Sequence, residues 1–322
     1  MKSLSAGKSL LCSIRNAAKE VGGVYFITCL DIVWSGIRYG ASPNNYVNFD
    51  FRHASVKERK TFLTHQKNEF LMKKFNNSSE VWKLENKYEF ARMIGHGYGR
   101  SFARTDTITL EELMHITGNG RIIYKPLQGG QGIGIKVFNT NDYKDADKFL
   151  TFLHDLPVGI IEQWIDQEET LSELYPDAVN PIRIQSLYTD KVHIMAATIT
   201  IANGTDIANA SGVKAIFGLV DVNDGSVYTD GYDYNGCMYV THPLTGIKIR
   251  GFQIPRWKEV LELIDKSARK FPQVRHIGWD IAITKEGPVI IEANNDPGYT
   301  AYQLPQLTGN HTGIWPLYKE YL

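Results

Sequence analysis

The sequence lacks the residue patterns that define several common classes of protein. Its 322 residues include three cysteines, which are odd in number and widely spaced, at Cys12, Cys29 and Cys237. This spacing argues against a disulfide framework and against a cysteine-rich zinc site, so we expect a reducing, cytoplasmic setting. The nine histidines form no HxH or HExxH pattern, and no serine or cysteine stands in a nucleophile elbow. The sequence therefore gives no support for a zinc enzyme or a covalent hydrolase.

Long apolar runs and an excess of charge are also absent. No segment reaches the roughly 18 apolar residues that a membrane span needs. The most apolar N-terminal run, VGGVYFITCLDIVW, is interrupted by Asp31 and lacks a signal-peptide cleavage pattern. We expect a buried strand or helix there. The formal net charge is +0, which removes any general electrostatic case for nucleic-acid binding.

The order of patterns along the chain predicts an α+β fold with mainly antiparallel sheets. The first 50 or so residues look irregular, and residues 41–53 are expected to form a loop. From Arg121 onward, short β-rich segments alternate with glycine-containing turns, whereas a doubly wound parallel fold would alternate strand and helix more regularly. Helices are expected at 54–75, 87–94, 142–155 (with Asn141 or Thr140 as N-cap) and 255–271 (with Pro255 in the first turn).

A glycine-rich segment, YKPLQGGQGIGIKVF (124–138), lies between two apolar β-like stretches. The residues at its centre that we expect to contact a ligand are Gly129, Gly130, Gln131, Gly132 and Gly134. Backbone without Cβ atoms can approach a ligand closely and direct successive N–H groups at phosphate. We interpret the segment as a flexible hairpin that covers phosphates, with Lys125 as the charge partner. A plain structural hairpin is the alternative, and a dinucleotide fingerprint is disfavoured because a strand follows the glycines instead of a helix.

The segment GIIEQWIDQEE (159–169) is an apolar strand that ends at Glu162 and continues through Gln163, Trp164 and Ile165. Backbone groups there would bind the edge of a purine, and apolar side chains would enclose the ring. The alternative is an ordinary amphipathic strand end.

The segment GWDIAITKEGPVIIEANNDPG (278–298) predicts a metal site. Glu292 and Asn294 end an apolar strand and point to one face, because side chains at i and i+2 do so in a strand. A hairpin about residues 285–287 would bring Asp280 beside them. Two carboxylates and an amide oxygen suit Mg²⁺ better than zinc. The alternative is that the two acids are separately hydrogen-bonded structural residues.

These signals follow one another in an order that resembles the ATP-grasp superfamily: a first lysine, a glycine hairpin with a second lysine, a Glu-x-x-hydrophobic hinge, then Asp and Glu-x-Asn. Several shorter patterns resemble its sugar-transfer-associated family. They are VNPIRI (179–184), residues 209–212, GLVD (218–221), His242-Pro243, Ile254-Pro255-x-Trp257 and Gly278-Trp279-Asp280. The resemblance spans about residues 50 to 305. It implies two α+β lobes that clasp ATP, a small lobe at 86–165 and a large lobe at 166–322, preceded by a region at 1–85 that contributes to the acceptor side.

The resemblance also implies roles for individual residues. Lys87 and Lys125 would contact the nucleotide phosphates, Gly129 to Gly134 would cover them, and Glu162 to Ile165 would bind adenine. Either Glu168 or Glu169 would bind ribose. The metal ligands, of two Mg²⁺ ions in the family pattern, would be Asp280, Glu292 and Asn294. Many ATP-grasp ligases carry an arginine two residues before the metal aspartate, where this chain has Gly278. Arg183 is the candidate replacement, and Lys214 and Arg275 are further ones.

The implied function is an ATP-dependent carboxylate–amine ligase that forms an acylphosphate and then an amide or similar bond, in glycan or cell-surface polymer biosynthesis. Its partners would be a small-molecule or glycan carboxylate and an amine, with no nucleic acid and no membrane span. Two alternatives stay open. One is a small-molecule or sugar kinase on the same scaffold, and the other is a non-catalytic nucleotide-binding partner of a glycan-assembly system.

Overall fold

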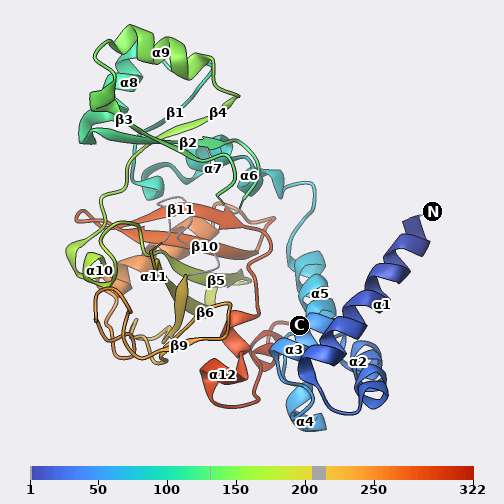
Figure 1. Cartoon of the computed structure of the whole chain (residues 1–322). Coiled ribbons are helices and arrows are strands. Elements are labelled where there is room, and N and C mark those ends of the chain that lie inside the picture. Colours follow the sequence, from blue (N-terminus) through green and yellow to red (C-terminus); the bar gives the residue numbers. More distant parts are fainter. Residues whose placement is uncertain (1, 131, 205–214) are drawn as a thin grey trace. The chain divides into compact units, whose positions relative to one another are not determined.

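The computed structural model describes residues 2–130, 132–204 and 215–322. The chain forms two compact units. The first, here the helical unit, comprises residues up to Phe75 together with Gly298–Leu322, and the second, here the sheet unit, comprises Asn76–Pro297. Figure 1 labels the elements of both. None of the described helices combines the length and the apolar character that a bilayer-spanning segment requires.

The helical unit is built around aromatic side chains. Phe49 and Phe62 stack with their ring centroids 4.8 Å apart, and Phe51 lies edge-on to Phe62 at 5.4 Å. The helices are α1 (Lys2–Val21), α2 (Tyr25–Tyr39), α3 (Pro43–Asn48), α4 (Val56–Arg59), α5 (His65–Phe75), α12 (Pro305–Thr308) and α13 (Trp315–Lys319), with a 3₁₀ turn, η5 (Ala301–Gln303).

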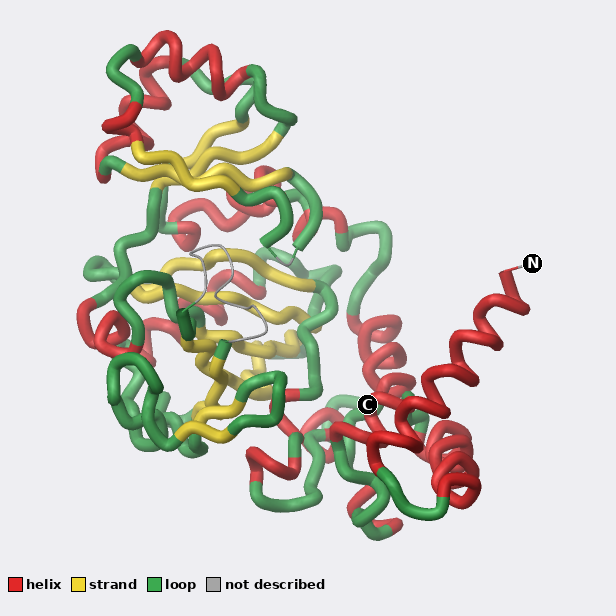
Figure 2. The backbone as a smooth tube through the Cα atoms, viewed as in Figure 1, coloured by secondary structure: helices red, strands yellow, loops and turns green. Residues whose placement is uncertain are grey.

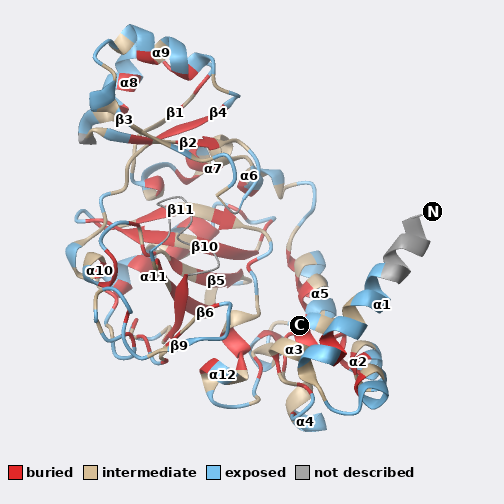
Figure 3. Ribbon diagram, viewed as in Figure 1, coloured by how far each residue is buried: buried red, intermediate tan, exposed pale blue. Residues whose placement is uncertain are grey.

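Three expectations for this region are wrong, one of which is the single helix at 54–75, because the structure has two separate helices there, α4 and α5. The first 40 residues are largely helical, as Figure 2 shows in red. Helix α3 lies within the segment expected to be a loop. It is started by Pro43 at its first position and by a capping box between Ser42 and Asn45, a pairing that satisfies otherwise unbonded N–H groups. The apolar run at 21–34, expected to be a buried strand or helix, forms the first part of α2 from Tyr25 onward and is only half-buried (Figure 3).

The smaller sheet of the sheet unit is antiparallel, with strand order β1-β4-β2-β3. Its strands are β1 (Phe102–Arg104), β2 (Arg121–Pro126), β3 (Lys136–Asn139) and β4 (Gly159–Gln163). Helices α8 (Leu110–Ile116) and α9 (Ala146–His154) pack against it through Leu113, Phe149 and Leu153. Helix α9 starts with Asp145 as its N-cap, so the expected cap at Asn141 or Thr140 is wrong; residues Thr140–Asp142 form the short turn η3 instead.

The larger sheet has the order β11-β10-β5-β6-β7-β8-β9, again antiparallel throughout. Its strands are β5 (Ile182–Tyr188), β6 (Val192–Ile201), β7 (Ile216–Val220), β8 (Gly231–Tyr232), β9 (Met238–Tyr239), β10 (His276–Ile283) and β11 (Pro288–Asn294). Helix α11 (Trp257–Ala268) packs against this sheet and buries Val260 and Ile264 in the hydrophobic core that the strands also line. It begins two residues after the expected Pro255. The predicted α+β fold with antiparallel sheets is confirmed.

The remaining helices of the sheet unit are short. Helix α6 (Trp82–Glu85) is followed by α7 (Lys87–Ile94), whose bounds match the predicted helix, and by the 3₁₀ turn η1 (Gly95–Tyr98). Another such turn, η2 (Thr117–Asn119), follows α8, and α10 (Glu169–Leu174) follows the hinge segment.

Candidate active site

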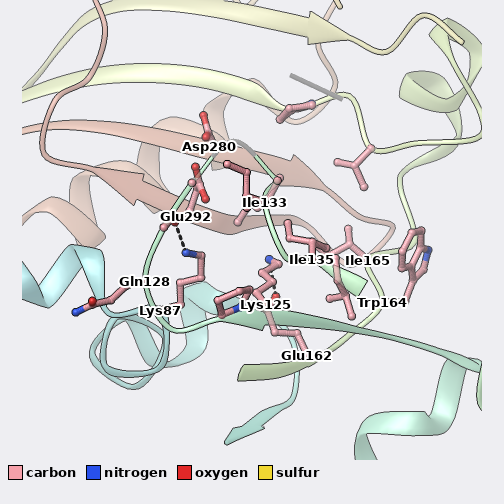
Figure 4. Close-up of a pocket in the computed structure, with 18 of the residues that line it drawn as sticks. Lys87, Lys125, Gln128, Ile133, Ile135, Glu162, Trp164, Ile165, Asp280 and Glu292 are labelled. Carbon is pink, nitrogen blue, oxygen red and sulfur yellow. Dashed lines mark hydrogen bonds and ion pairs between the residues drawn. The ribbon is translucent and has the colours of Figure 1, made fainter. Parts of the chain in front are cut away.

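One pocket of the sheet unit is lined by residues from both sheets (Figure 4). Lys125 and Glu162 come from β2 and β4 of the smaller sheet, and Asp280 and Glu292 come from β10 and β11 of the larger one. Lys87, at the start of α7, completes the charged lining. The structure thus brings together charged residues that lie up to 205 positions apart, between Lys87 and Glu292.

The acidic side of the pocket is set by strand register. Strands β10 and β11 form the expected hairpin, with Asp280 directly opposite Glu292 and Gly278 directly opposite Asn294. Directly opposed residues in an antiparallel pair share a face, and Asn294 Nδ2 donates to Glu292 Oε1 at 3.3 Å. The pairing shifts after Asp280, so that Ile291 becomes an extra residue on β11. Such a bulge re-aims neighbouring side chains.

Arg183 lies next to the acidic pair. It lies on β5, opposite Asp280 of β10. Its Nη1 donates to Asp280 Oδ1 at 3.0 Å and to Oδ2 at 2.9 Å. Burial raises the pKa of Asp280, Arg183 opposes this, and Glu292 raises the pKa further. A positive charge therefore offsets two close carboxylates.

Packing explains why position 278 is glycine and not the arginine that the resemblance implies there. A Cβ on Gly278 would lie 2.7 Å from Pro297 Cα and 2.9 Å from Pro297 Cβ, which is closer than packed carbon atoms approach. Position 278 therefore has no room for a side chain. The cation beside Asp280 comes from the neighbouring strand instead.

The basic side of the pocket contains a buried carboxylate with two cationic partners. Glu162 Oε2 accepts from Lys125 Nζ at 3.0 Å and from Arg100, at 2.8 Å from Nε and 2.7 Å from Nη2. Burial alone would raise the pKa of Glu162, but the charges of Arg100 and then Lys125 lower it to about 2. Glu162 Oε1 is also buried and meets no hydrogen-bond partner in the described part of the chain. Because an unpaired buried oxygen is costly, this atom is suited to accept from a bound ligand.

Sequence reasoning missed Arg100. Besides Glu162, its guanidinium donates to the carbonyl oxygens of Tyr98 at 2.9 Å and of Ile290 at 2.8 Å, and it stacks 3.6 Å from the centroid of the Tyr98 ring. It thereby joins the hinge carboxylate to the backbone of β11, two residues before Glu292. No local pattern marks it, because each of these partners except Tyr98 is at least 62 positions away.

Lys87 is held against the glycine-rich segment. Its Nζ donates to the Gly129 carbonyl at 2.6 Å, and its backbone N–H donates to Leu127 O at 3.0 Å. Burial lowers the pKa of Lys87, and the charge of Glu292 opposes this shift. Gly129, Gly130 and Gly132 line the pocket. Gly129 has φ of +103°, a conformation that favours glycine.

Other predicted positions in this segment fall elsewhere. Gly134 does not line the pocket and packs against Pro126. The strand expected after the glycines is β3, which begins at Lys136. Gln131 lies outside the described residues, as does Lys214.

The hinge residues Gln163, Trp164 and Ile165 all line the pocket. The backbone N–H of Gln163 donates to Ser101 O at 2.9 Å and that of Trp164 donates to Arg121 O at 3.3 Å. Among the described residues, the Ile165 N–H meets no acceptor within the protein. It is therefore the hinge amide that is left for a ligand.

The two carboxylates proposed for ribose do not line the pocket. Glu168 caps α10 by accepting from Leu171 N at 3.2 Å, and Glu169 pairs with Lys285 at 3.0 Å. Arg275 is likewise not among the lining residues. The ribose ligand stays a prediction.

The oxygen set at β10–β11 is suited to a hard divalent cation. Nowhere in the described ranges do three or more His, Cys, Asp or Glu side chains gather as a complete metal site. If each side chain gives one oxygen, two carboxylates and one amide leave about half of the six positions of an octahedral ion to other oxygens. That matches how Mg²⁺ binds, through one or two carboxylates together with phosphate and water.

A family model described as sugar-transfer associated ATP-grasp matches residues 66–314. The chain belongs to this family, and the predicted ATP-grasp fold is confirmed. No curated protein matches the chain significantly.

Several solved structures are similar at low identity. An ATP-grasp ligase, PsnB, complexed with a minimal precursor is 14% identical with a TM-score of 0.45, over 82% of this chain and 69% of that one. An L-amino acid ligase from Bacillus licheniformis is 12% identical (TM-score 0.41; 72% and 46%). A carboxyaminoimidazole ribonucleotide synthase from Aspergillus clavatus complexed with ATP is 13% identical (0.39; 67% and 46%). The chain thus spans less than half the length of the last two.

Proposed function

We propose that the protein is an ATP-dependent, ADP-forming carboxylate–amine ligase. One observation carries the proposal: a single pocket holds Lys87 and Lys125 together with the Asp280–Glu292 pair, and Arg183 adjoins that pair. Fixed positive charge suits a triphosphate, and paired carboxylates suit the cations that accompany it. The proposed reaction requires no side chain that acts as a covalent nucleophile.

The hinge side would bind the nucleotide base. The Ile165 N–H is available to donate to a purine ring nitrogen, and the buried Glu162 Oε1 is available to accept from an exocyclic amine. Lys87 and Lys125 would contact the phosphates. The glycine segment would cover them and exclude water, which an acylphosphate intermediate requires. Glu168 or Glu169 remains the proposed ribose ligand after a local rearrangement, since neither lines the pocket.

The cation would be held by Asp280, Glu292 and Asn294, and it would supply charge neutralisation at the β- and γ-phosphates. We propose two Mg²⁺ ions, as the family pattern implies.

The reaction proceeds in two displacements. A substrate carboxylate oxygen attacks the γ-phosphorus, the bond to ADP breaks, and an acylphosphate forms. An amine then attacks the carbonyl carbon, loses a proton and displaces inorganic phosphate, which leaves an amide. Arg183 would stabilise the oxyanion of this second step by donating hydrogen bonds where negative charge develops. Lys214 is a further proposed catalytic cation. The family's description favours an acceptor from glycan or cell-surface polymer assembly.

The test is ADP formation from Mg·ATP with panels of carboxylates and amines, with hydroxylamine added to trap the acylphosphate. We expect ADP and hydroxamate with wild type and a loss of at least about 100-fold in kcat for Glu292→Ala. Glu262→Ala, an exposed glutamate on α11, is the matched control and should retain activity. Formation of AMP, phosphate transfer to a hydroxyl without amide, or full activity of Glu292→Ala would each reject the proposal.

A further inference from the structure

Helix α2 exposes a continuous apolar stripe. Its buried residues, Thr28, Ile32, Ser35 and Tyr39, follow helical spacing and face the core of the helical unit. A second set with the same spacing lies on the opposite side of the helix, because 3.6 residues complete one turn. Its members, with their exposed fractions, are Phe26 (71%), Leu30 (55%), Val33 (43%) and Ile37 (74%).

The stripe is wider than these four residues. Val24, Tyr25, Ile27 and Trp34 of the same segment are exposed, as are Leu10 and Leu11 of α1. Isolated exposed apolar side chains are ordinary, but a contiguous patch marks an interaction surface. Packing among the described residues does not account for the patch, since the inner face of α2 already supplies Ile32 and Tyr39 to the core.

The charges beside the stripe are predominantly basic. Arg15, Lys19, Arg38 and Arg52 are exposed, and Arg52 is anchored at the α1–α2 turn by donating to Val21 O at 2.8 Å. Of the two acids in residues 9–40, Asp31 is neutralised by two hydrogen bonds from Arg59 at 2.7 and 2.8 Å. Glu20 is the other. The segment therefore carries a local positive surplus in a chain whose formal net charge is +0.

We propose that the α1–α2 hairpin docks the protein on an anionic lipid surface, with α2 lying in the plane of the interface. An apolar helix face with tryptophan and phenylalanine, flanked by basic residues, is the pattern of interfacial helices. Helix α2 has 15 residues, about 22 Å at helical rise, which is too short to span the roughly 30 Å hydrocarbon core.

A second copy of the chain fits this surface less well. A two-fold dimer brings the same patch of both copies together, so the arginines and lysines of the two hairpins would repel. Anionic headgroups instead complement these charges. The inference is independent of the proposed function, since no residue of the pocket belongs to this hairpin.

The experiment is co-sedimentation of the full chain with vesicles of equimolar phosphatidylcholine and phosphatidylserine, beside pure phosphatidylcholine vesicles. We expect binding to the anionic vesicles at least about tenfold tighter than to the neutral ones, and weaker binding at high salt. Leu30→Ser/Ile37→Ser should lose binding by at least about tenfold, because two apolar side chains no longer enter the lipid. Arg15→Gln/Arg38→Gln should lose the preference for anionic lipid.

The matched control is Val240→Ser/Leu244→Ser, which removes two comparably exposed apolar side chains from the sheet unit and should bind as wild type. Circular dichroism and thermal unfolding establish that each variant is folded, and the single variant Phe26→Ser repeats the test if the double variant is not. Failure of wild type to bind either vesicle overturns the proposal. So does concentration-dependent dimerisation that the α2 variants abolish while lipid binding is absent.

Discussion

Glu162 has two oxygens in different situations, and this difference defines its role. Oε2 accepts from Lys125 and Arg100, whereas Oε1 is buried without a partner in the described chain. The first oxygen ties the residue into the fold, and the second is the one that we propose for a bound ligand. A glutamine at this position would keep the volume but lose the charge that both cations compensate.

This charge predicts a specific dependence of stability on pH. The folded-state pKa of about 2 lies below the ordinary value of 4.5. Ionised Glu162 therefore stabilises the fold above pH 4.5, and this contribution is lost as the pH falls toward 2. The difference in unfolding free energy between wild type and Glu162→Gln should shrink by a few kcal/mol over that window. Urea unfolding at several pH values measures it, with exposed Glu262→Gln as the control. A difference that does not change with pH would contradict this prediction.

Arg100 is predicted to be a positioning residue that needs its charge. Arg100→Met removes the main partner of a buried carboxylate and three hydrogen bonds to the backbone carbonyls of Tyr98, Ile290 and Ile291, so we expect a loss of about 3–5 kcal/mol. Adding Glu162→Gln should recover part of this loss, because the uncompensated charge is then gone. Arg104→Met, which breaks a part-exposed pair with Asp106, should cost about 1 kcal/mol or less. Thermal and urea unfolding of wild type, the two single variants, the double variant and Arg104→Met decide it. Additive losses would show that Arg100 does not act through Glu162.

At the scale of elements, the sequence predicts best where local signals agree. The apolar runs and the 285–287 turn specify the β10–β11 hairpin, and the bounds of α7 match those expected. For the run that forms α2 the sequence left strand and helix open, because the outer face of this helix is apolar and the usual alternation of polar and apolar faces is absent. The register shift after Asp280 was not foreseeable either, since a bulge depends on pairing across strands.

Gly278 on β10 is predicted to tolerate no side chain. Gly278→Ala would place a Cβ 2.7 Å from Pro297 Cα, so we expect destabilisation of about 1–3 kcal/mol through overpacking. Gly278→Arg should be worse and should not supply the missing family arginine. Gly118→Ala is the control, since a Cβ there meets no atom within 4 Å. Thermal unfolding compares the three variants, and a neutral Gly278→Ala would show that the turn after β11 moves freely.

For the whole molecule, the family and the antiparallel α+β fold were predictable because ordered motifs along the chain carry them. The cationic network around Glu162 and the exposed stripe of α2 were not, because both depend on which side chains the fold brings together or leaves uncovered. Arg183 shows the intermediate case. The resemblance to ATP-grasp proteins suggested Arg183 as the cation that replaces the missing arginine. Only the strand register places it opposite Asp280.

Binding of Mg·ATP should distinguish the two units. All lining residues of the pocket belong to the sheet unit, Asn76–Pro297, and a ligand that binds the folded state stabilises what it contacts by about 2.7 kcal/mol at 100 times its Kd. Hydrogen exchange should therefore slow in peptides from β2, the glycine segment, the hinge and β10–β11. Peptides from the helical unit should exchange as before, because none of the residues that line the pocket belongs to it. Glu292→Gln should weaken the Mg²⁺-dependent part of the protection, with Glu262→Gln as its control. Protection that appears mainly in Lys2–Val21 or Tyr25–Tyr39 would place the nucleotide elsewhere and contradict the assignment of the pocket.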